Sequence, residues 1–230
     1  MLGDVTNPFS KGPHFFLNLW HFFGLSFWIV LLRIFNHVTI LGKENIPKKG
    51  ERGVLFLYNH ISAIDPFVIG VTSMPFFSPV WWKAPAKEEL FKNSFLRYLL
   101  YSWGAFPVRR GQQDQMAMDS MVQMAKDNVL VIAPEGRRSP TGDLLPGRPG
   151  VGRVIHFGKP NKIIPVLLQG TEQVLPKGRF WPRFFRKIII TYGPSLNFSS
   201  FDHVPNTKEV SQVIVDEVMN SILVLMKDSG

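Results

Sequence analysis

The stretch VLFLYNHISAIDPFVI, residues 54–69, decides the fold. Its first four residues form an apolar run that predicts a short buried strand. Asp65 followed by Pro66 is typical of a helix N-cap and a first helical position. His60 therefore stands where a strand ends and Asp65 where a helix begins, and the turn between them lets the side chains meet. An imidazole held by a carboxylate is a general base with a fixed tautomer. The same residues also fit an ordinary N-cap beside an unrelated histidine.

Strand and helix signals alternate along the rest of the chain. This alternation predicts an α/β fold with a mixed, largely parallel sheet flanked by helices. A capping box, Asn206 followed by Glu209, indicates the start of the last helix. The strands are predicted at residues 37–41, 54–57, 80–83, 105–108, 128–133, 163–168 and 187–192, and the helices at 86–101, 113–126, 150–157 and 206–227.

The segment 14–36 is strongly apolar and precedes this pattern. Some 20 helical residues would span about 30 Å, enough to cross a bilayer. Asn18, His21 and Gly24 interrupt the run, however, and His14 falls on one helical face with Asn18 and His21. This pattern favours a helix that lies in the membrane interface or dips into it. A buried core helix is an alternative, and a signal peptide is disfavoured because a basic start and a small-residue cleavage site are missing.

The composition narrows the classes of partner. The chain has 230 residues, no cysteine and a formal net charge of +9. Disulfides and thiolate nucleophiles are therefore excluded, and anionic partners are favoured. Most of the charge lies in residues 144–190, which contain nine basic residues and one acidic residue. No recognised nucleic-acid-binding motif accompanies this charge, so a phosphorylated substrate or an anionic membrane is preferred over nucleic acid.

Polar residues follow three of the predicted strands. His60 and Asp65 follow the first, the pair 109–110 follows the strand at 105–108, and PEGRRS at 134–139 follows another. Ligands bind beyond the carboxyl ends of strands in such sheets, so these groups are expected to converge on one crevice. Arginine forks suit bidentate phosphate binding, although any one arginine also fits a solvated surface charge.

Several common catalytic motifs are missing. The six histidines are scattered without HExxH spacing, which argues against a metal site. There is no GxxxxGK[ST] phosphate loop, no GxGxxG and no G-x-S-x-G elbow. A base and anion-binding arginines without an evident covalent nucleophile indicate direct transfer of a group to a substrate hydroxyl.

Four blocks together resemble the glycerolipid acyltransferase family, most closely the 1-acylglycerol-3-phosphate (lysophosphatidate) acyltransferases. The blocks occur in the family's order, and the similarity runs from about residue 38 to 198. Two departures are present: Arg109 stands where the family often has Asp, and Arg137 where it often has Thr, whereas Arg148 replaces a frequent lysine. The blocks are Asn59-His60-x-Ser62-x-x-Asp65, Phe106-Pro107-Val108-Arg109-Arg110-Gly111, Pro134-Glu135-Gly136-Arg137-Arg138-Ser139 and Ile164-Pro165-Val166.

The resemblance implies roles for these residues. His60 would deprotonate the acceptor hydroxyl, and Asp65 would hold and stabilise the imidazolium. The acyl donor would be acyl-CoA or acyl carrier protein, with no metal or other cofactor. The substrate-binding residues are predicted to be Asn59, Ser62, Arg110, Glu135, Gly136 and Arg138, of which Arg110 and Arg138 would bind the acceptor phosphate while Glu135 and Gly136 shape that site.

Association with a membrane is expected, because a lysolipid substrate resides in a bilayer. Residues 177–187, KGRFWPRFFRK, interleave cations with aromatics. Basic residues are attracted to an anionic leaflet, and aromatic rings settle at the interface. We therefore expect residues 1–36 to be a membrane-anchoring segment and 37–230 to be the acyltransferase domain, located at the cytoplasmic face of the cell membrane.

The favoured function is acylation of lysophosphatidate to phosphatidate in phospholipid biosynthesis. Three alternatives keep the chemistry and change the acceptor to glycerol-3-phosphate, another lysophospholipid or a lyso-amino-acid lipid. A fourth is a non-catalytic lipid-binding module that retains the fold.

Overall fold

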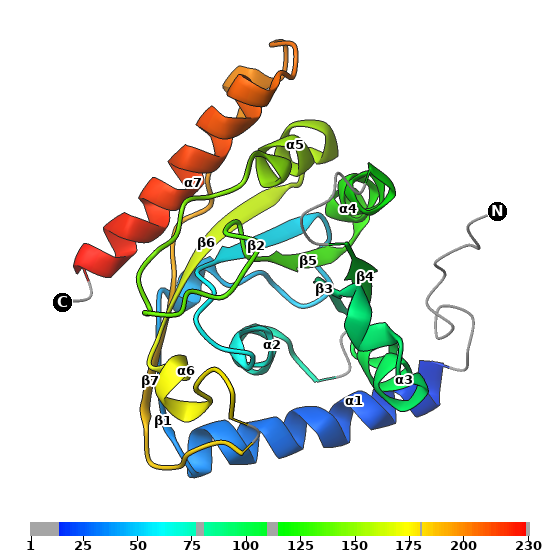
Figure 1. The fold of residues 1–230 in the computed structure, drawn as a ribbon, viewed down its shortest axis with the longest axis vertical. Coiled ribbons are helices and arrows are strands. Elements are labelled where there is room, and N and C mark those ends of the chain that lie inside the picture. Colours follow the sequence, from blue (N-terminus) through cyan, green and yellow to red (C-terminus); the bar gives the residue numbers. More distant parts are fainter. Residues whose placement is uncertain (1–13, 77–80, 110–114, 180, 229–230) are drawn as a thin grey trace.

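Figure 1 shows the protein as a computed structural model, which describes residues 14–76, 81–109, 115–179 and 181–228. The elements alternate between strand and helix, as predicted. The strands are β1 (His37–Leu41), β2 (Val54–Tyr58), β3 (Trp82–Lys87), β4 (Ala105–Val108), β5 (Val129–Ile132), β6 (Lys162–Gln169) and β7 (Lys187–Tyr192). The α-helices are α1 (His14–Ile29), α2 (Asp65–Ser73), α3 (Ser94–Ser102), α4 (Gln115–Asp127), α5 (Pro149–Gly158), α6 (Thr171–Val174) and α7 (Lys208–Asp228).

The strands form a seven-stranded sheet in the order β1-β7-β6-β2-β5-β3-β4. Strands β6 and β7 are antiparallel, and the other neighbouring pairs are parallel. The prediction of a mixed, largely parallel sheet flanked by helices is therefore confirmed. All five residues of β2 are buried, as expected for a central strand covered on both faces.

Two apolar cores cover the two faces of the sheet. One core contains Leu25 of α1 and Ile69 of α2, and it lies between those helices and the sheet. The other contains Val154 of α5 and Val218 of α7, with Val122 of α4. In Figure 1, α5 and α7 accordingly lie on the opposite side of the sheet from α1 and α2. The two layers fix the strands and leave their carboxyl ends open for a site.

Helix α1 presents two apolar faces. One faces the protein, where Leu25 is buried and His21 stacks on Trp81 at 3.6 Å between ring centroids. His21 Nε2 also lies 2.7 Å from the carbonyl oxygen of Ser102. His21, one of the polar residues that interrupt this helix, therefore does not face solvent but docks the helix against the protein. The other face is exposed and carries Phe16, Trp20, Phe23 and Phe27. The π-helix Val30–Ile34, which follows α1, also exposes Val30 and Ile34.

Two predicted boundaries are wrong. Residues 86–101 do not form one helix: β3 continues to Lys87, a 3-10 helix follows, and the Asn93 side chain then caps α3 by accepting from the Leu96 N–H. The last helix is capped by Thr207, whose Oγ1 accepts from the Val210 N–H, rather than by Asn206. Of the strand predicted at 80–83, the first residue lies outside the described residues.

Candidate active site

A pocket of about 210 Å³ opens at the carboxyl ends of the parallel strands. His60 after β2, Gly136 after β5 and Arg109 after β4 all line it. The strands that carry these residues lie next to one another or one strand apart, in the order β2-β5-β3-β4. The three polar groups predicted to share a crevice therefore do so.

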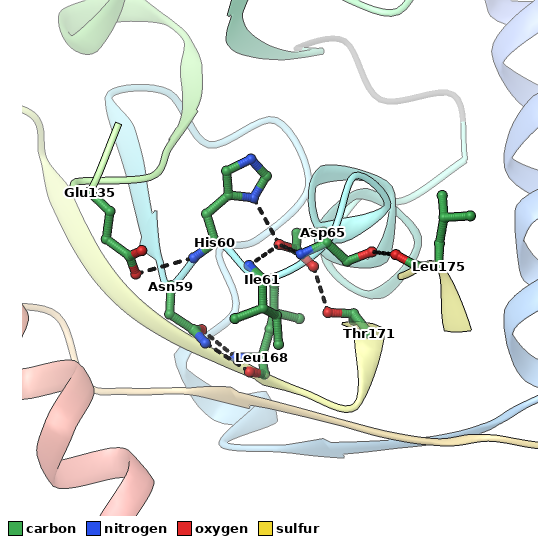
Figure 2. A network of polar contacts seen from close by, with 9 residues as sticks. Asn59, His60, Ile61, Asp65, Glu135, Leu168, Thr171 and Leu175 are labelled. Carbon is green, nitrogen blue, oxygen red and sulfur yellow. Dashed lines mark hydrogen bonds and ion pairs between the residues drawn. The ribbon is translucent and has the colours of Figure 1, made fainter. Parts of the chain in front are cut away.

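His60, which lines the pocket, is paired with Asp65, as Figure 2 shows. The His60 Nδ1–H donates to Asp65 Oδ2 at 2.9 Å, which leaves the other ring nitrogen, Nε2, available at the pocket. The Asp65 side chain is fully buried, and that of His60 is 12% exposed. A carboxylate on Nδ1 fixes the tautomer in which Nε2 accepts a proton, so the pair has the geometry of a general base.

The Asp65 carboxylate binds the loop that precedes it, in addition to His60. Its Oδ2 accepts from the backbone N–H groups of Ile61 and Ser62, each at 2.8 Å. Asp65 is itself the first residue of α2, and Ile64 occupies the cap position without a side-chain bond. The predicted N-cap role is therefore wrong, because the carboxylate turns back to organise the His60 turn instead of capping the helix.

Thr171 is a partner of Asp65 that sequence analysis missed. Its Oγ1–H donates to Asp65 Oδ1 at 2.6 Å, and the residue is fully buried. Thr171 opens α6, which follows β6 through Gly170 at φ +85°. The only local signal is a Gly-Thr pair after a buried strand, and nothing in it points to a carboxylate 106 residues away.

Asn59 and Ser62 have structural roles that differ from the predicted substrate binding. Asn59 is 2% exposed, and its amide both donates to the Leu168 carbonyl and accepts from the Leu168 N–H, at 2.9 and 2.7 Å. The Ser62 hydroxyl donates to the Leu175 carbonyl at 3.0 Å and is buried. Both side chains are occupied by backbone partners, so they hold the His60 turn and do not face the pocket.

Glu135 is buried behind His60. Its Oε1 accepts the His60 backbone N–H at 3.3 Å, and its Oε2 has no hydrogen-bond partner in the part of the chain that the structure describes. Burial, together with the nearby charge of Asp65, raises the pKa of Glu135 to about 7. Glu135 therefore exchanges a proton near neutral pH while it supports the backbone of the base.

Among the described arginines, Arg109 and Arg148 line the pocket. Arg148 reaches over Gly136, where an added Cβ would lie 3.0 Å from the Arg148 side chain. Arg109 also lines the pocket, and its Nε donates to both carboxylate oxygens of Glu88, at 3.0 and 3.2 Å. Arg138 is half-buried and is not among the lining residues, and Arg110 lies outside the described residues.

Away from His60, the pocket is apolar. It runs between the sheet and the helices α4 and α5, where Met118, Met121, Val151 and Val154 line it. A site with a base and cations at one end and aliphatic side chains at the other suits a substrate that carries a charged head and an alkyl chain.

A second group of exposed apolar residues lies at the end of the N-terminal helix. The residues described between β6 and β7 expose Trp181 and Phe185, at 85% and 77%. They are tied to the helix end: the Phe185 N–H donates to the Phe35 carbonyl, and the Arg186 N–H donates to the Asn36 side chain. Phe180, from the predicted basic and aromatic segment, lies outside the described residues.

The sequence model of the acyltransferase family matches residues 37–169. Similar proteins include the 1-acyl-sn-glycerol-3-phosphate acyltransferase of Bacillus subtilis (strain 168), 26% identical over 186 residues that cover 79% of this chain and 85% of that protein. The enzyme of the same name from Limnanthes douglasii is 28% identical over 181 residues, which are 76% of this chain and 58% of the plant protein.

Among solved structures, the crystal structure of the 1-acyl-sn-glycerophosphate (LPA) acyltransferase PlsC from Thermotoga maritima is similar, with a TM-score of 0.65. The alignment covers 91% of this chain and 79% of that one, at 23% sequence identity. At this identity the likeness establishes a shared fold.

Proposed function

This chain belongs to the acyltransferase family, and from that premise we propose that it acylates the sn-2 hydroxyl of lysophosphatidate with a fatty acyl thioester. The product would be phosphatidate, for phospholipid biosynthesis. The observation that carries the proposal is the His60–Asp65 pair, whose His60 lines a pocket that combines two arginines with an apolar interior. The names of the Bacillus and Limnanthes relatives support this acceptor.

The site supports direct acyl transfer. His60 Nε2 takes the proton of the acceptor hydroxyl as its oxygen bonds to the thioester carbonyl carbon. Asp65 stabilises the imidazolium that forms. When the tetrahedral intermediate collapses, the carbon–sulfur bond breaks and the proton passes from His60 to the leaving thiolate. An ester and a free thiol result. A positioned base of this kind contributes about 10²- to 10⁴-fold in rate.

Arg148 and Arg109 are the cations placed to bind the acceptor phosphate, and Gly136 lets the Arg148 side chain pass close to the backbone. Arg109, at a position where the family often has Asp, also forms an exposed ion pair with Glu88. Arg110 stays a predicted phosphate ligand.

The exposed face of α1 supports association with a membrane. Residues 15–34 are long and apolar enough to cross a bilayer, and 17% of the most apolar part is buried in the protein. A core helix would be mostly buried, so the exposed stripe is better explained by lipid. We place the active site at the cytoplasmic face, where acyl thioesters are available.

The proposal is tested by acyl transfer from labelled acyl-CoA, and separately from acyl carrier protein, to lysophosphatidate in vesicles. Wild type is compared with His60→Ala and with a control, His203→Ala, which alters an exposed histidine. We expect phosphatidate from wild type and the control only. Glycerol-3-phosphate and other lysolipids serve as competing acceptors, and preference for one of them would overturn the assigned acceptor. We also propose that no metal is needed, so activity should survive chelation by EDTA.

A further inference from the structure

The turn that carries His60 is bonded to one distant segment, residues 168–175, by three of its side chains (Figure 2). Asn59 pairs with the backbone of Leu168 at the end of β6. Asp65 accepts from Thr171, and the Ser62 hydroxyl donates to the Leu175 carbonyl. Of these bonds, only that from Thr171 reaches the catalytic pair itself.

Thr171 satisfies the one oxygen of Asp65 that the local turn does not. Asp65 Oδ2 already accepts from His60 and from two backbone N–H groups, whereas Oδ1 accepts, among the described residues, from Thr171 alone, at 2.6 Å. Both residues are completely buried, so water does not replace a lost donor easily. A buried carboxylate oxygen without a donor is costly, and the carboxylate can rotate to seek another partner.

The Thr171 side chain is held in place by its own backbone. Gly170 has φ +85°, and a Cβ at that position would lie 2.1 Å from the Lys187 carbonyl oxygen in β7. The turn thus presses directly on the neighbouring strand, and α6 begins at a fixed point. The packing of Gly170 against β7 therefore fixes the position of the Thr171 hydroxyl.

We propose that Thr171 is a positioning residue for the acyl-transfer reaction, which fixes the orientation of the Asp65 carboxylate and thereby the orientation of His60. The inference rests on the proposed function, because it assigns a role within the same reaction. Thr171 does not line the pocket, so it acts on the rate through Asp65 and not through substrate binding.

Thr171→Val tests this role, because valine keeps the shape and removes the hydroxyl. A hydrogen bond to a charged group is worth enough to change a rate about 10- to 100-fold. We expect kcat to fall by about that factor, with KM for both substrates changed less than about threefold. Thr171→Ser, which retains the donor, should recover kcat to within about threefold of wild type. Without the Thr171 donor, the Asp65 charge acts more strongly on the imidazolium, so the acid limb of the kcat profile should move to higher pH.

The matched control is Thr191→Val in β7, because Thr191 Oγ1 is buried without a hydrogen-bond partner in the described chain. This variant should keep the kcat and the pH profile of wild type. If Thr171→Val behaves like Thr191→Val, the positioning role is overturned. Should Thr171→Val not fold, Thr171→Ser and Thr171→Ala decide instead, since they differ by the hydroxyl alone, and equal kcat for both would overturn the role. An inactive wild type would contradict the proposed function itself.

Discussion

The His60 turn and helix α1 differ in how their side chains are partnered. Residues 59–65 are rich in polar groups, and every polar side chain in the turn has a partner within the protein. Helix α1 is almost wholly apolar, yet it exposes Phe16, Phe23 and Phe27 at 60–69%. The polar side chains of the turn are satisfied by contacts within the protein, whereas α1 presents an apolar surface that the described chain does not cover.

The difference separates catalytic geometry from membrane contact. Buried polar groups need fixed partners, so the base is held by contacts that do not depend on lipid. A wide apolar surface is stabilised by any apolar medium, so α1 can meet lipid without specific bonds. Changes in the turn should therefore alter chemistry and stability, and changes on the exposed face of α1 should alter binding to vesicles alone.

Asp65→Ala should have the largest effect. It removes the acceptor of the Ile61 and Ser62 N–H groups and of the Thr171 hydroxyl, all of which are then buried without a partner. We expect activity to be lost and the free energy of unfolding to fall by about 3–5 kcal/mol. Denaturant unfolding followed by circular dichroism measures the loss. A stable Asp65→Ala protein would show that the turn is held by something other than this carboxylate.

The triple substitution of Phe16, Phe23 and Phe27 by Ser should come next. Each phenylalanine contributes about 1.5–3 kcal/mol when fully buried in an apolar medium, so partition into anionic vesicles should fall on the order of 10³-fold. Vesicle sedimentation measures this partition. The control is Val213→Ser with Val224→Ser, which alters exposed apolar residues of α7. Equal binding by the triple variant and wild type would argue that α1 does not contact lipid.

Glu135→Gln should change how stability depends on pH. The pKa of Glu135 is raised to about 7 in the fold, so the folded state binds more protons than the unfolded state between about pH 4.5 and 7. The free energy of unfolding of wild type therefore falls as pH rises through this window. Glutamine lacks this loss, and relative to wild type it should gain at most about 3 kcal/mol between pH 4.5 and 8. Thermal unfolding across this range measures the stability of wild type, of Glu135→Gln and of the exposed control Glu217→Gln. If the stabilities of wild type and Glu135→Gln changed in parallel with pH, the raised pKa of Glu135 would be contradicted.

Gly136→Ala should have the smallest effect on stability, about 1–2 kcal/mol, because φ is +68° and the Arg148 side chain must shift by a few tenths of an ångström. If Arg148 binds the acceptor phosphate, KM for lysophosphatidate should also rise. The control is Gly142→Ala, at φ +90° with no atom within 4 Å of the added Cβ. This variant imposes similar backbone strain without touching Arg148. If KM rose equally in both variants, the role of Arg148 in binding the acceptor phosphate would be contradicted.

Much of the fold was predictable because its signals are local. Short apolar runs predicted β2, β4 and β5, and the sheet was predicted to be largely parallel. The failures have local causes too. The Ala86–Tyr101 pattern hid the Asn93 cap, and Thr207 took the capping role expected of Asn206. At the last helix two neighbouring residues, Asn206 and Thr207, could cap, and only the folded chain chose between them.

The sequence by itself determined the order of the elements, because strand and helix signals are local. It also predicted that His60 could meet Asp65, five positions away, and that polar groups after three strands would share one edge of the sheet. Only the tertiary structure decided that Asn59 and Ser62 brace the turn, that Thr171 completes Asp65 and that Arg148 lies over Gly136. The bonds to β6 and α6 join residues more than 100 positions apart. A hydrogen bond across that separation leaves no periodic or compositional trace, because either partner alone fits many other environments.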